Sequence, residues 1–213
     1  PTEFQKDLLP DIIKPNVKVI HDGIDTDYLK PIEDLSVKIG GTTFTKKNKL
    51  ITYVSRSLDP YRGFHIFVNS IPKILKDNPE ANILIVGNAE TPGYGATPPE
   101  GKMYKEICYG PIEDEIDNSR VHFLGRIPYD AFVKIIQLST IHVYLSYPFV
   151  LSWSMLEAMS CGALVIGSNT DPVTEVIQDE KNGLIVDFFD SDSIAEKVTQ
   201  VLNNSNKYND LRN

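Results

Sequence analysis

Two arginines in one short segment have the residue type that binds phosphate, and a glutamate in a second segment is a further candidate for chemistry. Arg56 and Arg62 lie on either side of a turn, SRSLDPYRG, that follows an apolar run. Each planar guanidinium group can hold two phosphate oxygens at once, so a pair of them on one turn suits a phosphate-bearing ligand. Glu157 lies in the second segment, IHVYLSYPFVLSWSMLEAMSCGALVIGS, which spans residues 141–168.

The segment around Glu157 predicts a strand, a loop, a helix and a second strand. Residues 141–145 and 163–167 are apolar runs typical of buried strands, and residues 155–161 form a short helix closed by Gly162. This order is a βαβ unit, which requires a parallel sheet. The N-terminus of such a helix points its free N–H groups at the crevice above the sheet, where phosphates bind.

Both groups of residues also have an ordinary structural explanation. Ser154 and Glu157 fit the Ser-x-x-Glu capping box, in which Glu157 would only satisfy a backbone donor, and this short pattern alone favours that role. Two arginines in a loop are most often solvated surface side chains. The motifs around these residues are therefore needed to distinguish a structural role from ligand binding.

The rest of the chain alternates strands with helices. Strands are predicted at residues 17–21, 50–55, 83–87, 121–124 and 184–186, and helices at residues 63–77, 102–109, 129–138, 172–178 and 191–202. Residues 25–48 and 88–100 are predicted to be loops. This order predicts a doubly wound, Rossmann-like α/β domain with a parallel sheet.

Composition excludes several classes of function. The net charge of −8 argues against nucleic acid as a partner, since polyanion binding needs clustered Lys and Arg. The two cysteines, Cys108 and Cys161, form no CxxC pair and are expected to be free thiols. The four histidines lack metal-ligand spacing, and the acidic run at residues 113–117 is expected to be a solvated loop. No G-x-G-x-x-G follows the first strand, so a dinucleotide oxidoreductase is not expected.

The segment LEAMSCGALVIGSNTDPVTEVIQDEKNGLIVD resembles the signature of retaining glycosyltransferases of the GT-B fold, family 4. That signature has two Glu separated by seven residues, then Ala-Met-Ala-x-Gly, and later Glu-x-Ile and Asn-Gly. The second Glu of the signature falls on Glu157. The resemblance therefore implies that Glu157 binds the ribose hydroxyls of a nucleotide-sugar.

Two further motifs match the same family. Its first strand is followed by Arg, five residues and Lys-Gly, whose two cations bind the donor diphosphate. Arg56 matches the Arg, and Arg62 replaces the Lys and keeps the charge. Backbone groups just after Phe-Leu-Gly read the base edge in the family, and Ile127 takes that position here.

One motif position departs from the family. Phe149 stands where the first Glu of the signature would contact hydroxyls of the donor sugar, and a phenyl ring cannot accept a hydrogen bond. Either backbone groups of Val150, Leu151 and Ser152 hold the sugar instead, or the site binds nucleotide-sugar without transferring it. We favour the first, because the other donor-site positions are present and N–H groups at a helix start can stabilise a diphosphate.

The resemblance covers roughly residues 17–204 and implies the C-terminal, donor-binding half of a two-domain enzyme. Residues 1–30 would be the end of the N-terminal half and the linker, and residues 31–213 the nucleotide-sugar-binding domain. The N-terminal acceptor domain would be absent from this chain, which starts at Pro1 without Met. The chain alone is therefore expected to be inactive.

The resemblance also implies partners and location. The full-length protein would be a retaining, hexosyltransferase-like enzyme of polysaccharide biosynthesis, cytoplasmic and peripheral to the membrane. Its partners would be a nucleotide-sugar donor, an unidentified acceptor that is a glycan, a lipid-linked molecule or a small molecule, and its own N-terminal domain. No cofactor and no metal are expected, since cations and helix dipoles neutralise the leaving diphosphate in family 4. The sequence predicts no function for the segment 88–119.

Overall fold

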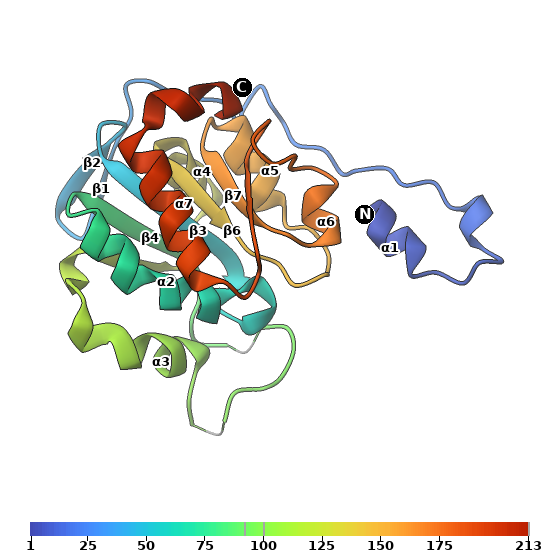
Figure 1. Ribbon diagram of the computed structural model, residues 1–213, viewed down its shortest axis with the longest axis horizontal. Helices are drawn as coiled ribbons and strands as arrows, with labels where there is room; N and C mark the ends of the chain where they lie inside the picture. Colours follow the sequence, from blue (N-terminus) through green and yellow to red (C-terminus); the bar gives the residue numbers. More distant parts are fainter. Residues whose placement is uncertain (92, 100, 213) are drawn as a thin grey trace.

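A parallel sheet of six strands forms the centre of the molecule in a computed structural model that describes residues 1–91, 93–99 and 101–212 (Figure 1). The strand order is β5-β4-β3-β6-β7-β8. The strands are β3 (Lys49–Ser57), β4 (Ala81–Asn88), β5 (Val121–Gly125), β6 (Ile141–Tyr144), β7 (Leu164–Ser168) and β8 (Leu184–Val186). The predicted Rossmann-like α/β class is thereby confirmed.

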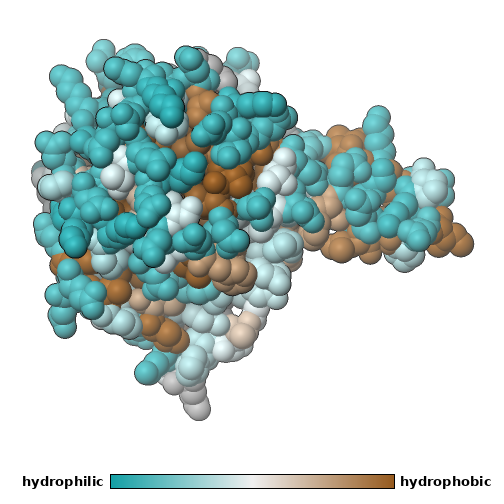
Figure 2. Space-filling model, in the orientation of Figure 1, coloured by the Kyte–Doolittle hydropathy of each residue, from teal (hydrophilic) through white to brown (hydrophobic). Residues whose placement is uncertain are grey.

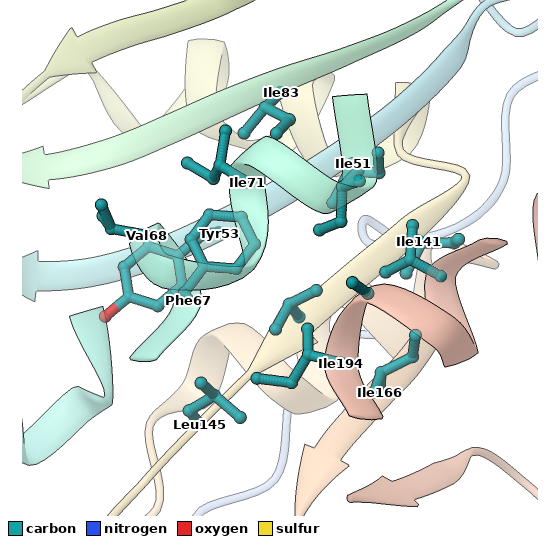
Figure 3. Close-up of a cluster of buried hydrophobic side chains, with 14 of the residues drawn as sticks. Ile51, Tyr53, Phe67, Val68, Ile71, Ile83, Ile141, Leu145, Ile166 and Ile194 are labelled. Atoms are coloured by element: carbon teal, nitrogen blue, oxygen red, sulfur yellow. The ribbon is translucent and has the colours of Figure 1, made fainter. Parts of the chain in front are cut away.

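Helices cover both faces of this sheet. The longer helices are α2 (Phe64–Asp77), α4 (Tyr129–Leu138), α5 (Trp153–Ser160) and α7 (Ser191–Asn203). On one face, Ile141 of β6 belongs to the same core as Phe67 of α2 and Ile194 of α7 (Figure 3). On the other face, Tyr144 of β6 packs with Met155 of α5. Alternate residues of one strand thus enter opposite cores, as period-two geometry requires.

The chain reverses its direction of growth between β3 and β6. From β3 it adds β4 and then β5 on one side, and it returns to place β6 on the other side of β3. Thr52 of β3 pairs in register with His142 of β6, so the two strands run side by side to the same edge. In open α/β sheets, ligands bind outside the carboxyl ends of strands at such a switch point.

A β-hairpin occupies part of the segment predicted to be a loop at residues 25–48. Its strands, β1 (Ser36–Ile39) and β2 (Thr42–Thr45), pair antiparallel across Gly40-Gly41. Both glycines have positive φ, +53° and +92°, which a two-residue hairpin turn needs. Phe44 is buried beneath the sheet with Leu50 and Leu84, so the hairpin closes a third small core.

Two other predicted elements differ from the structure. Residues 17–21 form no strand, because they run along an arm where no neighbouring strand offers hydrogen bonds, and Ile20 is 67% exposed. The helix predicted at residues 172–178 is only α6 (Asp171–Thr174). The remaining predicted strands and helices are present with small shifts of their ends.

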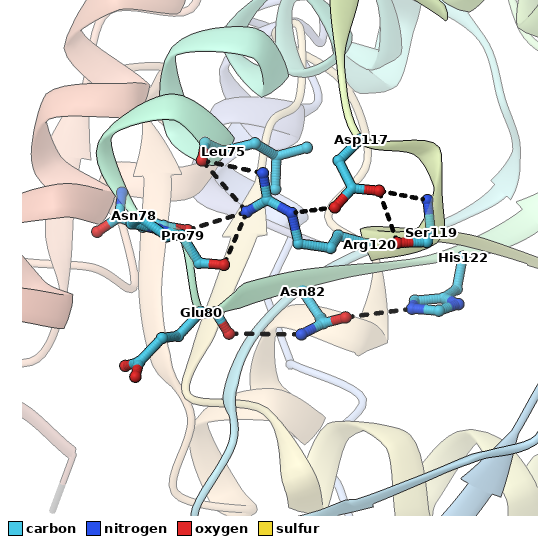
Figure 4. A network of polar contacts seen from close by, with 9 residues as sticks. All are labelled: Leu75, Asn78, Pro79, Glu80, Asn82, Asp117, Ser119, Arg120 and His122. Carbon is cyan, nitrogen blue, oxygen red and sulfur yellow. Dashed lines mark hydrogen bonds and ion pairs between the residues drawn. The ribbon is translucent and has the colours of Figure 1, made fainter.

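The segment between β4 and β5, which we call the insertion, has helices within its described residues. These are α3 (Tyr104–Tyr109) and two 3-10 helices, Gly110–Glu115 and Asn118–Arg120. Arg120 donates to the carbonyls of Leu75, Asn78 and Pro79 at 3.1–3.2 Å, and pairs with Asp117 at 3.1 Å (Figure 4). The insertion is thereby tied to the end of α2, whose last carbonyls have no partner within the helix.

Residues before the hairpin form an arm that leaves the body of the domain (Figure 1). Its helix α1 (Glu3–Asp7) lies against α6, where the Glu175 carboxylate accepts from the amides of Glu3 and Phe4 at 2.8 and 2.7 Å. Apolar side chains gather on this arm (Figure 2), where Leu8 and Ile12 are 70% and 84% exposed. None of the helices in the described ranges has the length and apolar character needed to cross a membrane.

Candidate functional site

A cavity of about 760 Å³ opens at the carboxyl ends of β3 and β6, at the switch point of the sheet. Its walls come from the turn after β3, the loop after β6, the start of α5 and the start of α4. The lining residues are Val54, Ser55, Arg56, Asp59, Arg62, Tyr94, Tyr129, Phe132, Phe149, Val150, Leu151, Ser152, Trp153, Ser154 and Glu157. Seven of the eight predicted site residues lie here, so motifs about 100 residues apart meet in one place.

The turn after β3 places both arginines at the cavity. Asp59 caps the 3-10 helix Pro60–Arg62 by accepting from the Arg62 amide at 3.2 Å. Gly63 then continues with φ +67°, and a Cβ there would collide with Leu145. This left-handed glycine turns the chain directly into α2 and keeps Arg62 at the sheet edge.

The two guanidinium groups differ in how they are held. Arg56 is exposed and makes no hydrogen bond within the described part of the chain. Arg62 is half-buried, and its Nη1 donates to Ser146 Oγ at 2.8 Å and to Tyr144 Oη at 3.3 Å. One arginine is thus preoriented by the end of β6, while the other keeps all its donors for a ligand.

The start of α5 presents backbone donors to the same cavity. Its N-cap is Ser152, and across the described residues the amides of Val150, Leu151 and Trp153 have no hydrogen-bond partner. The Ser152 amide, in contrast, donates to Tyr144 Oη at 2.7 Å. The Ser152 amide is therefore already bonded to Tyr144, and the expected contact of the Val150, Leu151 and Ser152 backbone groups with a sugar stays a prediction.

Glu157 has a different role from a helix cap. The cap of α5 is Ser152, whose hydroxyl accepts from the Ser154 amide at 3.4 Å, so the capping-box alternative is wrong. Glu157 is only 4% exposed, and its Oε1 accepts from the Tyr129 hydroxyl at 2.7 Å. Burial raises the pKa of the Glu157 carboxyl, and the hydrogen bond from Tyr129 partly offsets this rise.

Phe149 packs against the Arg62 guanidinium group and a neighbouring aromatic ring. Its ring lies 5.4 Å from the guanidinium carbon of Arg62 and 4.9 Å from the ring of Tyr94. A cation over an aromatic face is an attractive contact. The residue that replaces the acidic motif position therefore helps to hold Arg62 in place.

Several lining residues were not predicted from the sequence. Tyr94, Tyr129, Asp59 and Trp153 carry no motif signal, and three-dimensional contacts alone bring them to the cavity. The Trp153 indole donates to Asp22 of the N-terminal arm at 2.9 Å, so the arm reaches the cavity rim. Ile127 does not line the cavity; its side chain packs at the edge of two cores, and its backbone contact to a base stays a prediction.

Other ionisable groups lie apart from this cavity. Within residues 1–91, 93–99 and 101–212, no cluster of three or more His, Cys, Asp or Glu side chains could hold a metal ion. Cys108 and Cys161 are free thiols, as predicted, and burial raises the pKa of both. A second cavity of about 700 Å³ lies between α3 and β5, and no arginine lines it.

The sequence matches the family described as glycosyl transferases group 1 over residues 39–213. The uncharacterized glycosyltransferase MJ1069 of Methanocaldococcus jannaschii is 26% identical over 193 residues, which are 90% of this chain and 45% of that protein. The chain therefore spans less than half the length of this relative.

Solved structures share the fold. The C-terminal domain of the glycosyl transferase group 1 family protein LpcC from Francisella tularensis matches with a TM-score of 0.71 at 20% identity, over 89% of this chain and 93% of that chain. Anabaena Alr3699/HepE, solved in complex with UDP-glucose, matches with a TM-score of 0.65 at 20% identity, over 78% of this chain and 42% of that chain. By its sequence match, the chain belongs to the glycosyl transferases group 1 family, and its fold is that of a GT-B C-terminal domain.

Proposed function

We propose that this domain binds the nucleotide-diphosphate sugar donor of a retaining, family 4 glycosyltransferase. One observation carries the proposal: Arg56, Arg62 and Glu157 line a single cavity at the switch point of the sheet. The arginines suit a diphosphate, and the buried carboxylate suits a pair of ribose hydroxyls. The group 1 family match and the Anabaena structure with UDP-glucose support this assignment.

The cavity offers a separate group for each part of the donor. The Arg56 and Arg62 guanidinium groups would bind the diphosphate together with the amides of Val150 and Leu151 at the start of α5. Oε1 of Glu157 is held by Tyr129, which leaves Oε2 to accept from a ribose hydroxyl. A buried carboxylate fixed by one hydrogen bond is preoriented for the next.

In the proposed reaction, these groups act on the leaving diphosphate. The acceptor oxygen forms a bond to the anomeric carbon as the bond from that carbon to the diphosphate oxygen breaks. The electron pair leaves with the diphosphate, and the acceptor proton moves to the departing oxygen on the same face, so configuration is retained. Donors already fixed around the diphosphate stabilise the charge that develops there.

The whole protein needs more than this domain. An N-terminal domain would hold the acceptor and the far face of the sugar, and residues 1–30 would be its end and the linker to it. Without that half, the proximity contribution is lost, so the chain alone should transfer no sugar. We propose no metal or organic cofactor, a cytoplasmic location with peripheral membrane association, and a role in polysaccharide biosynthesis.

A binding module without transfer activity is the second candidate, and Phe149 in the acidic motif position favours it. Full-length protein incubated with UDP-, GDP- and ADP-sugars separates the two functions. Release of the nucleoside diphosphate, with or without acceptor, supports the enzyme. Tight binding of a donor with no turnover supports the module, and no binding of any donor contradicts both.

A further inference from the structure

The segment between β4 and β5 reaches into the donor cavity at Tyr94. The Tyr94 amide donates to Asp59 Oδ2 at 3.2 Å, while Asp59 Oδ1 accepts from the Arg62 amide at 3.2 Å. One buried carboxylate thus joins the insertion to the turn that carries the arginines. The insertion is therefore positioned by the same residue that caps the arginine turn.

Two glycines make this close approach possible. A Cβ on Gly93 would collide with the Asp59 carboxylate, and a Cβ on Gly95 would collide with the Tyr61 ring. Gly95 also has φ +89°, which side chains rarely adopt. The sequence Gly93-Tyr94-Gly95 thus fits the surface of the arginine turn closely and directs the Tyr94 ring to the cavity.

Tyr94 and Phe149 together form what we call the aromatic wall of the cavity. Their ring centroids lie 4.9 Å apart, and both residues line the cavity. Tyr61 supports the wall from behind, with its ring 5.9 Å from Phe149. Phe149 also lies against Arg62, so the wall adjoins the proposed diphosphate position.

The order of groups in the donor assigns the wall to the sugar. Ribose, diphosphate and sugar follow one another in a nucleotide-sugar. Glu157 accepts a hydrogen bond from Tyr129, whereas Phe149 of the wall packs against the Arg62 guanidinium group. With ribose at Glu157 and diphosphate at the arginines, the sugar is the group that remains to meet the wall.

The wall gives the sugar few hydrogen-bond acceptors. Phenyl and phenol faces accept none of ordinary strength, and both oxygens of nearby Asp59 are already bonded to backbone amides. A hydroxyl turned toward this wall would lose water without gaining a partner, whereas a methyl group would gain apolar contact. A hexose whose hydroxymethyl group is replaced by methyl fits this surface better than its parent.

We propose that Tyr94 and Phe149 bind the donor sugar through its apolar face and select a 6-deoxyhexose over the parent hexose. This inference rests on the proposed function, since it assumes a nucleotide-sugar in the cavity. It assigns a role in specificity to the insertion between β4 and β5. It also explains how Phe149 can serve a donor site at the acidic motif position.

Calorimetry with matched ligands tests this selection. The chain is titrated with UDP, UDP-glucose and UDP-6-deoxyglucose. It is also titrated with GDP, GDP-mannose and GDP-D-rhamnose, whose sugar is 6-deoxymannose. For the base that binds, the 6-deoxy donor should bind about tenfold tighter than its parent, as expected for one group in an apolar pocket. Equal affinities, or tighter binding of the parent, would overturn the proposal.

Variants separate the wall from the rest of the site. Tyr94→Ala should reduce the preference to less than twofold, and it keeps the hydrogen bond to Asp59, which the backbone amide donates. Tyr94→Phe keeps the ring and should keep the preference. Phe149→Ala should also abolish it. If the preference survives in both alanine variants, the wall does not select the sugar; if no nucleoside diphosphate binds at all, the proposed function itself fails.

Discussion

The hydroxyl of Tyr129, at the start of α4, donates to the buried carboxylate of Glu157 in α5 at 2.7 Å. The bond joins two helices on the same face of the sheet. It fixes one carboxylate oxygen and leaves the other for a ligand. Burial, and next the bond to the carboxylate, raise the pKa of the Tyr129 hydroxyl, so it stays a donor throughout the physiological range.

Tyr129→Phe removes this donor and keeps the ring. We expect nucleoside diphosphate affinity to fall roughly three- to tenfold, because a net hydrogen bond contributes about 1 kcal/mol and the carboxylate loses its fixed orientation. Calorimetry with UDP, GDP and ADP measures the change. Tyr28→Phe is the matched control, since Tyr28 bonds Asp130 outside the cavity. An unchanged affinity in Tyr129→Phe would show that the hydrogen bond from Tyr129 is not needed to orient the Glu157 carboxylate for binding.

Glu157→Gln should lower kcat/KM for the sugar donor without lowering the thermal stability of the protein. Loss of a charge-assisted acceptor should lower kcat/KM of the full-length protein roughly ten- to a hundredfold, or about 1.5–3 kcal/mol. The raised pKa means that the unfolded chain ionises first as pH rises, so ionised Glu157 reduces folding stability at pH 7. The Gln variant should therefore melt no lower than the wild type. Unchanged kinetics in the folded variant would remove Glu157 from the donor site.

His142 should make the domain sensitive to acid. It is fully buried, its Nδ1 lies 2.9 Å from Thr52 Oγ1, and burial lowers its pKa to about 3. Between about pH 6.5 and this value the unfolded chain binds the additional proton, so stability contributed by neutral His142 is lost as pH falls through this window. The loss should be roughly 1.4 kcal/mol per pH unit.

Urea unfolding of His142→Gln at several pH values tests this effect. The difference in unfolding free energy between wild type and variant should shrink as pH falls from about 6 to 4, at roughly that slope. His21→Gln, on an exposed residue of the arm, is the control and should follow the wild type. A difference that does not depend on pH would contradict the assignment.

Arg120→Ala should destabilise the domain by about 2–3 kcal/mol, because carbonyls at the end of α2 lose charge-assisted donors. Thermal or urea unfolding measures the change. Arg126→Ala is the control, since Arg126 is exposed and should cost little. If both variants are equally stable, the network in Figure 4 does not hold the insertion in place.

The strands of the main sheet could be predicted because they are buried on both faces and appear as short apolar runs. The predicted strand at residues 17–21 has a similar pattern but no neighbouring strand to pair with. Whether a neighbour is present depends on the fold of the whole chain and cannot be inferred from the segment itself. The hairpin across Gly40-Gly41 was missed because its strands are mostly polar, although the two glycines carried the turn signal.

The site could be predicted only where a motif marks it. Arg56, Arg62 and Glu157 were identified by spacing and do share a cavity. Tyr94 and Tyr129 could not be found in this way, because their roles depend on contacts 35 and 28 residues distant along the chain. The bond between the Ser152 amide and Tyr144 likewise comes from packing of β6 against the start of α5.

Calorimetric titration of this chain with UDP, GDP and ADP measures directly whether the cavity binds a nucleotide. We expect weak binding of at least one nucleoside diphosphate, because the arginines, the amides at the start of α5 and Glu157 all belong to this domain. We also expect that replacing Arg56 and Arg62 together with Gln reduces this binding at least tenfold, as loss of two phosphate contacts requires. No heat of binding for any of the three at millimolar concentration, or equal binding by the double variant, would contradict the proposed donor site.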